Sequence, residues 1–550
     1  MLTIWHGTLA CSRSATDLSV YAIVRATPRK AHFMNDSTRC GSPSFVVVIL
    51  LGVILALLPI GTQVFAQSEE DQRAWLRALD SVSSERMLAD VRTLSSPAFN
   101  GRQAGSDDDL RSAQWVAREL TLAGVQLPLI DNKGIAFPAP GAGKEEPVGI
   151  MASMVSTPLI EPDPILRTGA ADQLVTAQLS RDYLPVFDSP SADLQGQVVF
   201  VGYGIVDPAQ GIDDYAGVDV KNCIVLFLRG KPDHYPSPVS HADKIRFARD
   251  RGAMAYLTAT GPILSPYEIR RGATGRPSAL YGQLSPDQAL PGAWISTKLA
   301  ETLLAGSGDE SNPDRLRTFQ EQLNNAPSAR SRLVNRYASL HWKTTIADGL
   351  LTNVVGMIPG TGPETIVIGA HRDHFGRPAG LWFPGADDNA SGTAIVLEVA
   401  RALGKIGVRP QRTILFLSFS GQERDLLGSR LYTSRPVIPL SSTKAMVNID
   451  HVGVGDGVLI LRGTELKKSI LKEAGWAVGL VRKLDYYGFL PGGDDGPFKE
   501  AGIPTVSIAI GGVHPHMQQP TDTADTINPE ILHTVARYVL ALTWQLANAP

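Results

Sequence analysis

Apolar runs rich in valine, isoleucine and leucine recur along the C-terminal part of the chain. Between the first run and the second, apolar residues recur at the spacing of an amphipathic helix. These runs cover residues 365–369, 413–419, 445–449 and 506–510. The helical spacing is carried by Ala394, Leu397, Ala400 and Leu403. Apolar strands alternating with amphipathic helices predict an α/β fold, with a mixed, mostly parallel sheet flanked by helices.

Two earlier blocks have a different pattern. Residues 67–137 are helical in character, with an apolar stripe from Leu110 to Leu120 that stops at Gly124. Residues 138–332 contain short β-rich runs separated by proline- and glycine-rich turns, and they predict a β-rich domain inserted in the chain. The third block, residues 333–550, carries the α/β pattern.

The first 66 residues predict a targeting segment. The apolar run from Phe45 to Ile60 is short for a membrane span, and Val64-Phe65-Ala66 fits a small-residue cleavage site. We therefore expect a signal peptide, with Met34 as the true start, and an exported protein that is periplasmic or extracellular. The alternative is an uncleaved anchor over residues 45–66, which would tether the protein to a membrane.

Composition narrows the function classes. The 550 residues include 51 lysines and arginines against 54 acidic residues, so no basic field points to nucleic acid. The three cysteines, Cys11, Cys40 and Cys223, exclude a disulfide-dense scaffold and a cysteine-rich zinc cluster.

Metal-ligating residue types follow the apolar runs of the third block. They are His371, Asp373, Asp387, Glu423, Asp450 with its neighbour His451, and His514. Each alone is ordinary, because a histidine after a strand is often a hydrogen-bonding residue and an aspartate before a helix is often an N-cap. Open α/β sheets bring the ends of their strands together, and converging carboxylates and imidazoles need a cation. The set predicts a divalent metal site, with zinc as the favoured ion.

Short sequence words in the third block carry a family resemblance. They are Asn353-Val-Val-Gly-Met-Ile-Pro-Gly, Gly369-Ala-His371-Arg-Asp373-His, Gly385-Ala-Asp387-Asp-Asn-Ala-Ser-Gly, Phe419-Ser-Gly-Gln422-Glu423-Arg, Asn448-Ile-Asp450 and Pro520-Thr-Asp522-Thr523. In this order they resemble the two-zinc aminopeptidases of metallopeptidase family twenty-eight, the aminopeptidase Y and S relatives. The middle block resembles the protease-associated domain inserted in such enzymes, and residues 67–137 resemble the start of the peptidase domain.

The resemblance implies a role for each matching residue. One zinc ion would be held by His371, Asp387 and Asp450, with Asp373 orienting the histidine. The other zinc ion would share Asp387 and add Glu423 and a late histidine. The implied substrate is a peptide or protein with a free N-terminus.

Two positions depart from the family pattern. Gln422 stands where the family has its general base, and an amide cannot accept a proton near neutral pH. Gln518 stands where the family has the late histidine, with His516 two residues away as a substitute ligand. Asp494 or Asp495 could replace the base. In the plainer interpretation, His374, His514 and His516 only form hydrogen bonds in loops.

Three functions therefore stay open. The first is a secreted zinc aminopeptidase with an altered general base and one altered metal ligand. The second is a catalytically degenerate relative that binds peptides or proteins without cleaving them. The third, a cyclase of the glutaminyl type with one zinc ion, is disfavoured because its site depends on the late histidine.

Overall fold

The computed structural model describes residues 69–549 except 132–133, 137–148, 233, 306–313, 326–330 and 489–491. The predictions of a signal peptide, a start at Met34 or an anchor fall on residues 1–66 and lie outside the described residues. Within the described part of the chain, no helix combines the length and apolar character that crossing a membrane requires.

A mixed sheet of eight strands organises the C-terminal part, in the order β19-β18-β20-β17-β15-β16-β14-β3. Its strands are β3 (Ile150–Ile160), β14 (Thr344–Ile358), β15 (Thr365–His371), β16 (Thr413–Phe419), β17 (Thr443–Ile449), β18 (Leu459–Thr464), β19 (Leu484–Tyr487) and β20 (Thr505–Ile510). The four strands predicted from apolar runs, β15, β16, β17 and β20, are adjacent and mutually parallel. The predicted mixed α/β fold is confirmed, and the carboxyl ends of these four strands share one edge.

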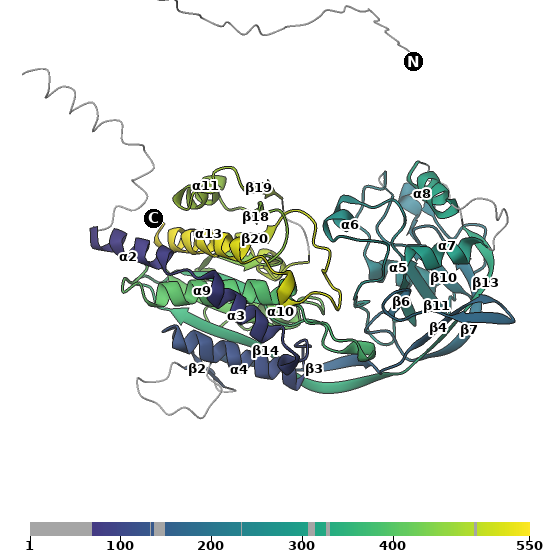
Figure 1. The fold of residues 1–550 in the computed structure, drawn as a ribbon, viewed down its shortest axis with the longest axis horizontal. Coiled ribbons are helices and arrows are strands. Elements are labelled where there is room, and N and C mark those ends of the chain that lie inside the picture. Colours follow the sequence, from purple (N-terminus) through teal and green to yellow (C-terminus); the bar gives the residue numbers. More distant parts are fainter. Residues whose placement is uncertain are drawn as a thin grey trace, which may run out of the picture. The chain divides into compact units, whose positions relative to one another are not determined.

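Helices cover both faces of this sheet. One face carries α2 (Glu69–Asp80), α3 (Ser84–Leu94), α4 (Asp107–Leu122), α9 (Ser391–Gly404), α11 (Lys468–Ala477) and α13 (Pro529–Asn548), whose buried residues form one core with the sheet. Figure 1 shows α9 and α13 side by side, with α3 next to them. The other face packs against α10 (Leu427–Ser434) and α12 (Asp495–Glu500) through Tyr432 and Phe498. The predicted helix that stops at Gly124 is α4, so an N-terminal segment completes this core.

A second sheet of eight strands forms the inserted part, in the order β5-β4-β13-β7-β10-β11-β12-β6. It comprises β4 (Ile165–Ala170), β5 (Gln173–Thr176), β6 (Tyr183–Pro185), β7 (Ala192–Phe200), β10 (Ile224–Leu228), β11 (Ala255–Ala259), β12 (Gly292–Ile295) and β13 (Arg332–Trp342). Helices α5 (His241–Arg249), α6 (Pro266–Arg270), α7 (Thr297–Ala305) and α8 (Arg315–Asn325) belong to the same stretch, so it is richer in helix than predicted. Two short ribbons, β1 (Leu129–Asp131) with β2 (Gly134–Ala136) and β8 (Val206–Asp207) with β9 (Ile212–Asp213), complete the strands of the described chain.

The second sheet begins and ends at other residues than the predicted insertion of 138–332. Strand β3 pairs with β14 in the first sheet, whereas β13 pairs with β4 and β7 in the second. Strands β13 and β14 are separated only by Lys343, so no proline- or glycine-rich turn marks the change of sheet. That this insertion is a protease-associated domain stays a prediction.

Candidate metal centre

The predicted ligands gather at the carboxyl edge of the four parallel strands. His371 is the last residue of β15, Glu423 follows β16, and Asp450 and His451 directly follow β17. All four side chains are buried or nearly so. Because strand ends in an open α/β sheet border the same crevice, three segments far apart in the sequence supply one site.

His371 lies at the centre of a first group of ligands with Asp388 and Asp450. Its Nε2 atom lies 3.5 Å from Asp388 Oδ1 and 3.4 Å from Asp450 Oδ1. On the other side of the ring, Nδ1 lies 3.5 Å from the carboxylate of Asp373 and 3.2 Å from its backbone carbonyl oxygen. Asp373 therefore occupies the position from which the family carboxylate would orient this histidine.

Asp388 also belongs to a second group of ligands, with His374 and Glu423. The Nδ1 atom of His374 lies 2.7 Å from Glu423 Oε1 and 3.9 Å from Asp388 Oδ2. One oxygen of Asp388 thus faces His371 and the other faces His374. A carboxylate placed between two groups of ligands is suited to bridge two metal ions.

This placement corrects the expected bridging residue, Asp387. The carboxylate of Asp387 lies 2.7 Å from Nδ1 of His514 and accepts a hydrogen bond from the backbone N–H of Gly453, at 2.8 Å. Its side chain therefore points away from the two groups, and the bridging position falls to the next residue, Asp388. His514 is a hydrogen-bonding loop histidine, as the plainer interpretation predicted.

The turn that separates the two aspartates is held by Asp522. Its two carboxylate oxygens accept hydrogen bonds from the backbone N–H groups of Asp387 and Asp388, at 2.8 and 3.1 Å. Asp388 has φ −112° and ψ 89°, an extended conformation, so consecutive side chains leave the backbone in different directions. Burial raises the pKa of Asp522 to about 7. The sequence word around Asp522 signalled the family, but this clamping contact was not predicted.

The late-loop substitute ligand is not in the site. His516 places Nδ1 2.9 Å from the hydroxyl of Thr521, and it joins neither group of ligands among the described residues. The loop turns through hydrogen bonds from Met517 to His514 and from Gln519 to His516, which leaves position 516 outside the cleft. The prediction that His516 ligates a metal is not supported by this geometry.

The two aspartates expected to replace the general base do not face the cleft beside Gln422. Gln422 lines the cleft, and its side-chain N–H donates to the backbone oxygen of Gly492 at 2.9 Å. Asp494 accepts a hydrogen bond from Ser429 at 2.6 Å, and burial raises its pKa to about 7. Burial raises the pKa of Asp495 to about 6. Neither aspartate lines the cleft, so neither faces the place where a substrate would bind.

Burial and close contacts set the charges in the cluster. Burial raises the pKa of Glu423 well above its usual range, and the nearby Asp388 carboxylate adds to the effect. Burial opposes ionisation of Asp450, but His451 and His371 outweigh it and hold the pKa of that carboxyl well below its usual range. Burial likewise opposes protonation of His371, yet its contacts with Asp373 and Asp450 raise its pKa well above 6.5.

The chemistry and spacing of the donors fit a divalent metal. Tetrahedral zinc with ligands at about 2.0–2.2 Å places neighbouring donor atoms about 3.4 Å apart. The two contacts of His371 Nε2, at 3.5 and 3.4 Å, match this separation. His371 Nε2 and Asp450 Oδ1 are buried and have no hydrogen-bond partner among the described residues. Buried polar atoms of this kind are stabilised when a cation binds them.

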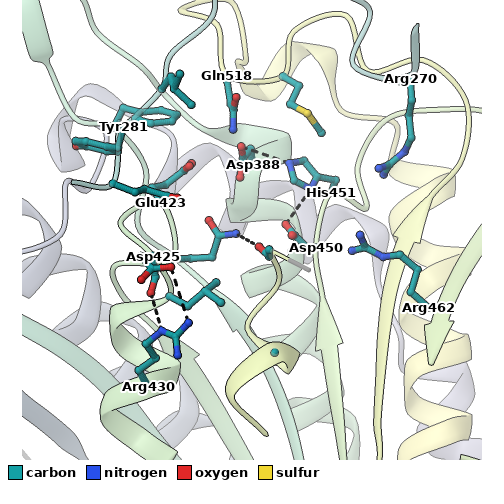
Figure 2. Close-up of a pocket in the computed structure, with 18 of the residues that line it drawn as sticks. Arg270, Tyr281, Asp388, Glu423, Asp425, Arg430, Asp450, His451, Arg462 and Gln518 are labelled. Atoms are coloured by element: carbon teal, nitrogen blue, oxygen red, sulfur yellow. Dashed lines mark hydrogen bonds and ion pairs between the residues drawn. The ribbon is translucent and has the colours of Figure 1, made fainter. Parts of the chain in front are cut away.

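The cluster opens into a cleft of about 510 Å³. Its floor is formed by Asp388, Glu423, Asp450 and His451. In Figure 2, dashed lines join the His451 side chain to Asp388 on one side and to Asp450 on the other. The walls come from both parts of the chain. The inserted part supplies Arg270, Leu280, Tyr281 and Gln283, and the part that contains the first sheet supplies Phe375, Arg462, Met517 and Gln518. The insertion therefore contributes to the surface that meets a ligand.

Three residues of the site were missed or given other roles by sequence reasoning. Asp388 was passed over for its neighbour, His374 was considered only as a hydrogen-bonding histidine in the plainer interpretation, and His451 was noted only as the residue after Asp450. The word His371-Arg-Asp-His374 was the one signal for His374, because it places a second imidazole three residues after the first.

The fold and this cluster define an α/β protein with a metal centre at the carboxyl edge of its sheet. Residues 353–543 match Peptidase family M28.

Three known proteins illustrate the similarity. A probable glutamate carboxypeptidase, AMP1, from Arabidopsis thaliana is 26% identical over 61% of this chain and 51% of its own. A probable leucine aminopeptidase from Arthroderma otae is 29% identical over 36% of this chain and 58% of its own. The solved structure of BSAP, a zinc aminopeptidase from Bacillus subtilis, has a TM-score of 0.55 and 19% identity, covering 85% of this chain and 96% of that one. The chain thus spans just over half the length of these two sequence relatives, and the structural likeness supports the fold.

Proposed function

We propose that this protein is an exported zinc-dependent aminopeptidase that removes N-terminal residues from peptides. The observation that carries the proposal is the position of Asp388, whose two oxygens face two separate groups of metal-ligating side chains on the floor of a cleft. The names of the similar proteins, a leucine aminopeptidase and a zinc aminopeptidase, support the reaction and the metal.

Each residue has a defined task in this function. His371 and Asp450 would hold one zinc ion, Glu423 would hold the other, and Asp388 would bridge them. Asp373 fixes the ring of His371 through two contacts. When bound, zinc supplies a Lewis acid that polarises the peptide carbonyl. The cleft walls would orient the peptide over this floor.

Hydrolysis of aminoacyl chromogenic substrates tests the proposal. The purified mature protein with added zinc is expected to release the chromophore, to lose this activity with a chelator, and to regain it when zinc is restored. N-terminally blocked versions of the same substrates serve as the control and should not be cleaved. Cleavage that survives complete removal of metal would overturn the proposal.

Replacing Gln422 tests the altered general base. The amide nitrogen of Gln422 lies 2.9 Å from the carbonyl oxygen of Gly492. A carboxylate would be repelled by that oxygen and would turn towards the cleft. Because proton transfer contributes about 10²–10⁴-fold, Gln422→Glu is expected to raise kcat by at least about 10²-fold. Gln422→Met, which supplies no base, should not raise it, and an equal gain in both variants would refute a proton-transfer role.

A binding protein without peptidase activity is the second candidate. It is favoured by the two amides at functional positions, since Gln422 is hydrogen-bonded to Gly492 and the side-chain oxygen of Gln518 accepts from Arg271. A zinc-loaded wild type that binds peptides but cleaves none, together with a Gln422→Glu, Gln518→His double variant that cleaves them, would select this function over the first.

Export is part of the proposal and has its own test. It rests on the apolar run 45–60 and the cleavage pattern that ends at Ala66. Expression in a bacterial host and N-terminal sequencing of the periplasmic product are expected to give Gln67 as the first residue. A membrane-bound product that retains residues 45–66 would identify an anchor instead.

A further inference from the structure

The second metal position has no imidazole from the late loop. Gln518 reaches the cleft, but its side-chain oxygen accepts a hydrogen bond from Arg271, and its backbone oxygen accepts one from Ala279. The amide is therefore held by the insertion. An imidazole for the second ion has to come from another element, and two histidines lie close to Asp388 Oδ2.

His451 presents a free ring nitrogen to this oxygen. Its Nε2 atom lies 3.3 Å from Asp388 Oδ2, is buried, and has no hydrogen-bond partner of suitable geometry among the described residues. The separation matches the distance of about 3.4 Å between neighbouring ligand atoms on tetrahedral zinc. Nδ1 lies 3.0 Å from Asp450 Oδ1, so a carboxylate also faces the other side of the ring.

The backbone at His451 is in an uncommon conformation. Its φ of 54° lies in the left-handed region, which costs energy for a residue with a side chain. This conformation directly after β17 places the imidazole in the cleft, where Figure 2 shows it between Asp388 and Asp450. Strained backbone conformations cluster at active sites and ligand-binding sites, so the strain at His451 points to a functional role for this residue.

His374 has a different geometry. Its Nδ1 atom lies 2.7 Å from Glu423 Oε1, which is a hydrogen-bond distance and is too short for two ligands of one zinc ion. Its distance to Asp388 Oδ2, 3.9 Å, is longer than the expected separation. His374 is thus placed to orient Glu423.

We propose that His451 ligates the second zinc ion through Nε2, beside Asp388 Oδ2, and that it replaces the late-loop histidine of the family pattern. His451 lies outside the group formed by His374, Asp388 and Glu423, so a bound ion would have to draw its ring closer to Glu423. His374 positions Glu423 and does not bind the metal. This inference rests on the proposed zinc site, and it assigns the missing ligand to the residue that follows Asp450.

Zinc binding to the metal-free protein tests the inference without an activity assay. Equilibrium dialysis against zinc is expected to give two bound ions for the wild type and one for His451→Asn. Asparagine tolerates the left-handed backbone, so this variant preserves the turn, and its thermal unfolding without metal should match that of the wild type. His516→Asn is the matched control and should keep two ions. His374→Asn should also keep two, with an affinity about 10–100-fold lower at one site.

A rescue variant sharpens the test. In His451→Asn combined with Gln518→His, the family ligand returns and two ions are expected again. Cobalt substitution gives a second readout, because loss of a ligand at one site changes the visible absorption of the bound ion. Two ions of unchanged affinity in His451→Asn, or a single ion in His374→Asn, would overturn the inference while the zinc site stands. A wild type that binds no zinc would overturn the proposed function as well.

Discussion

Asp388→Asn is expected to lower kcat/KM by at least about 10³-fold. The substitution keeps the size of the side chain but removes the charge that faces both groups of ligands. Metal ions contribute several kcal/mol to the stabilisation of the transition state, and each 1.36 kcal/mol corresponds to about tenfold in rate. Steady-state kinetics on an aminoacyl chromogenic substrate, together with measurement of bound zinc, checks both the rate and its cause.

Asp387→Asn is the matched control for this prediction. Asp387 contacts His514 and the backbone of Gly453 and does not face the ligands. Its substitution should therefore lower kcat/KM by only about 10–100-fold. Zinc binding should stay at the wild-type stoichiometry. If Asp387→Asn loses the metal and Asp388→Asn keeps it, the bridging role belongs to Asp387, as the family resemblance first suggested.

Asp109→Ala is expected to lower the free energy of unfolding by about 3–5 kcal/mol. Asp109 and Arg372 are both fully buried, with Arg372 donating to Asp109 Oδ1 at 2.8 Å. Asp109 also accepts hydrogen bonds from Ser420 at 2.8 Å and Thr352 at 3.0 Å. Removing the carboxylate leaves a guanidinium without its counter-ion in the core, directly beside the metal ligand His371. Urea denaturation followed by circular dichroism measures the change.

The neighbouring aspartate provides the comparison. Asp107 lies in the same first turn of α4 but is exposed, so Asp107→Ala should cost less than about 1 kcal/mol through the helix dipole alone. Equal losses in the two variants would show that the pair of Asp109 and Arg372 has no special weight. Asp109→Asn is a milder probe, because it keeps the volume and removes only the charge.

The fold was predictable where the hydrophobic pattern is strong. Strands β15, β16, β17 and β20 are apolar on both faces because helices cover both, and such runs are visible in a single sequence. The junction of the two sheets was not predictable. Strands β13 and β14 follow each other with one residue between them, so nothing local shows that they belong to different sheets.

The types of residue in the site were predictable from the sequence, but the direction in which each side chain points was less so. His371, Glu423 and Asp450 were placed because each follows a strand whose carboxyl end lies at the crevice. The choice between Asp387 and Asp388 depends on a turn held by Asp522, a residue 134 positions later than Asp388. The choice between His451 and His516 depends on the direction of each imidazole, which is set by the backbone and not by spacing in the sequence.

Exchange of the inserted domain between related proteins would change more than its own surface. Tyr281 and Gln283 line the cleft above the metal ligands, and Arg271 holds the loop that carries Gln518. A chimaera that received a foreign insertion would therefore have different residues above the metal ligands on the floor of the cleft. Under the proposed function, substrate preference could change there while the metal-holding strands stay the same.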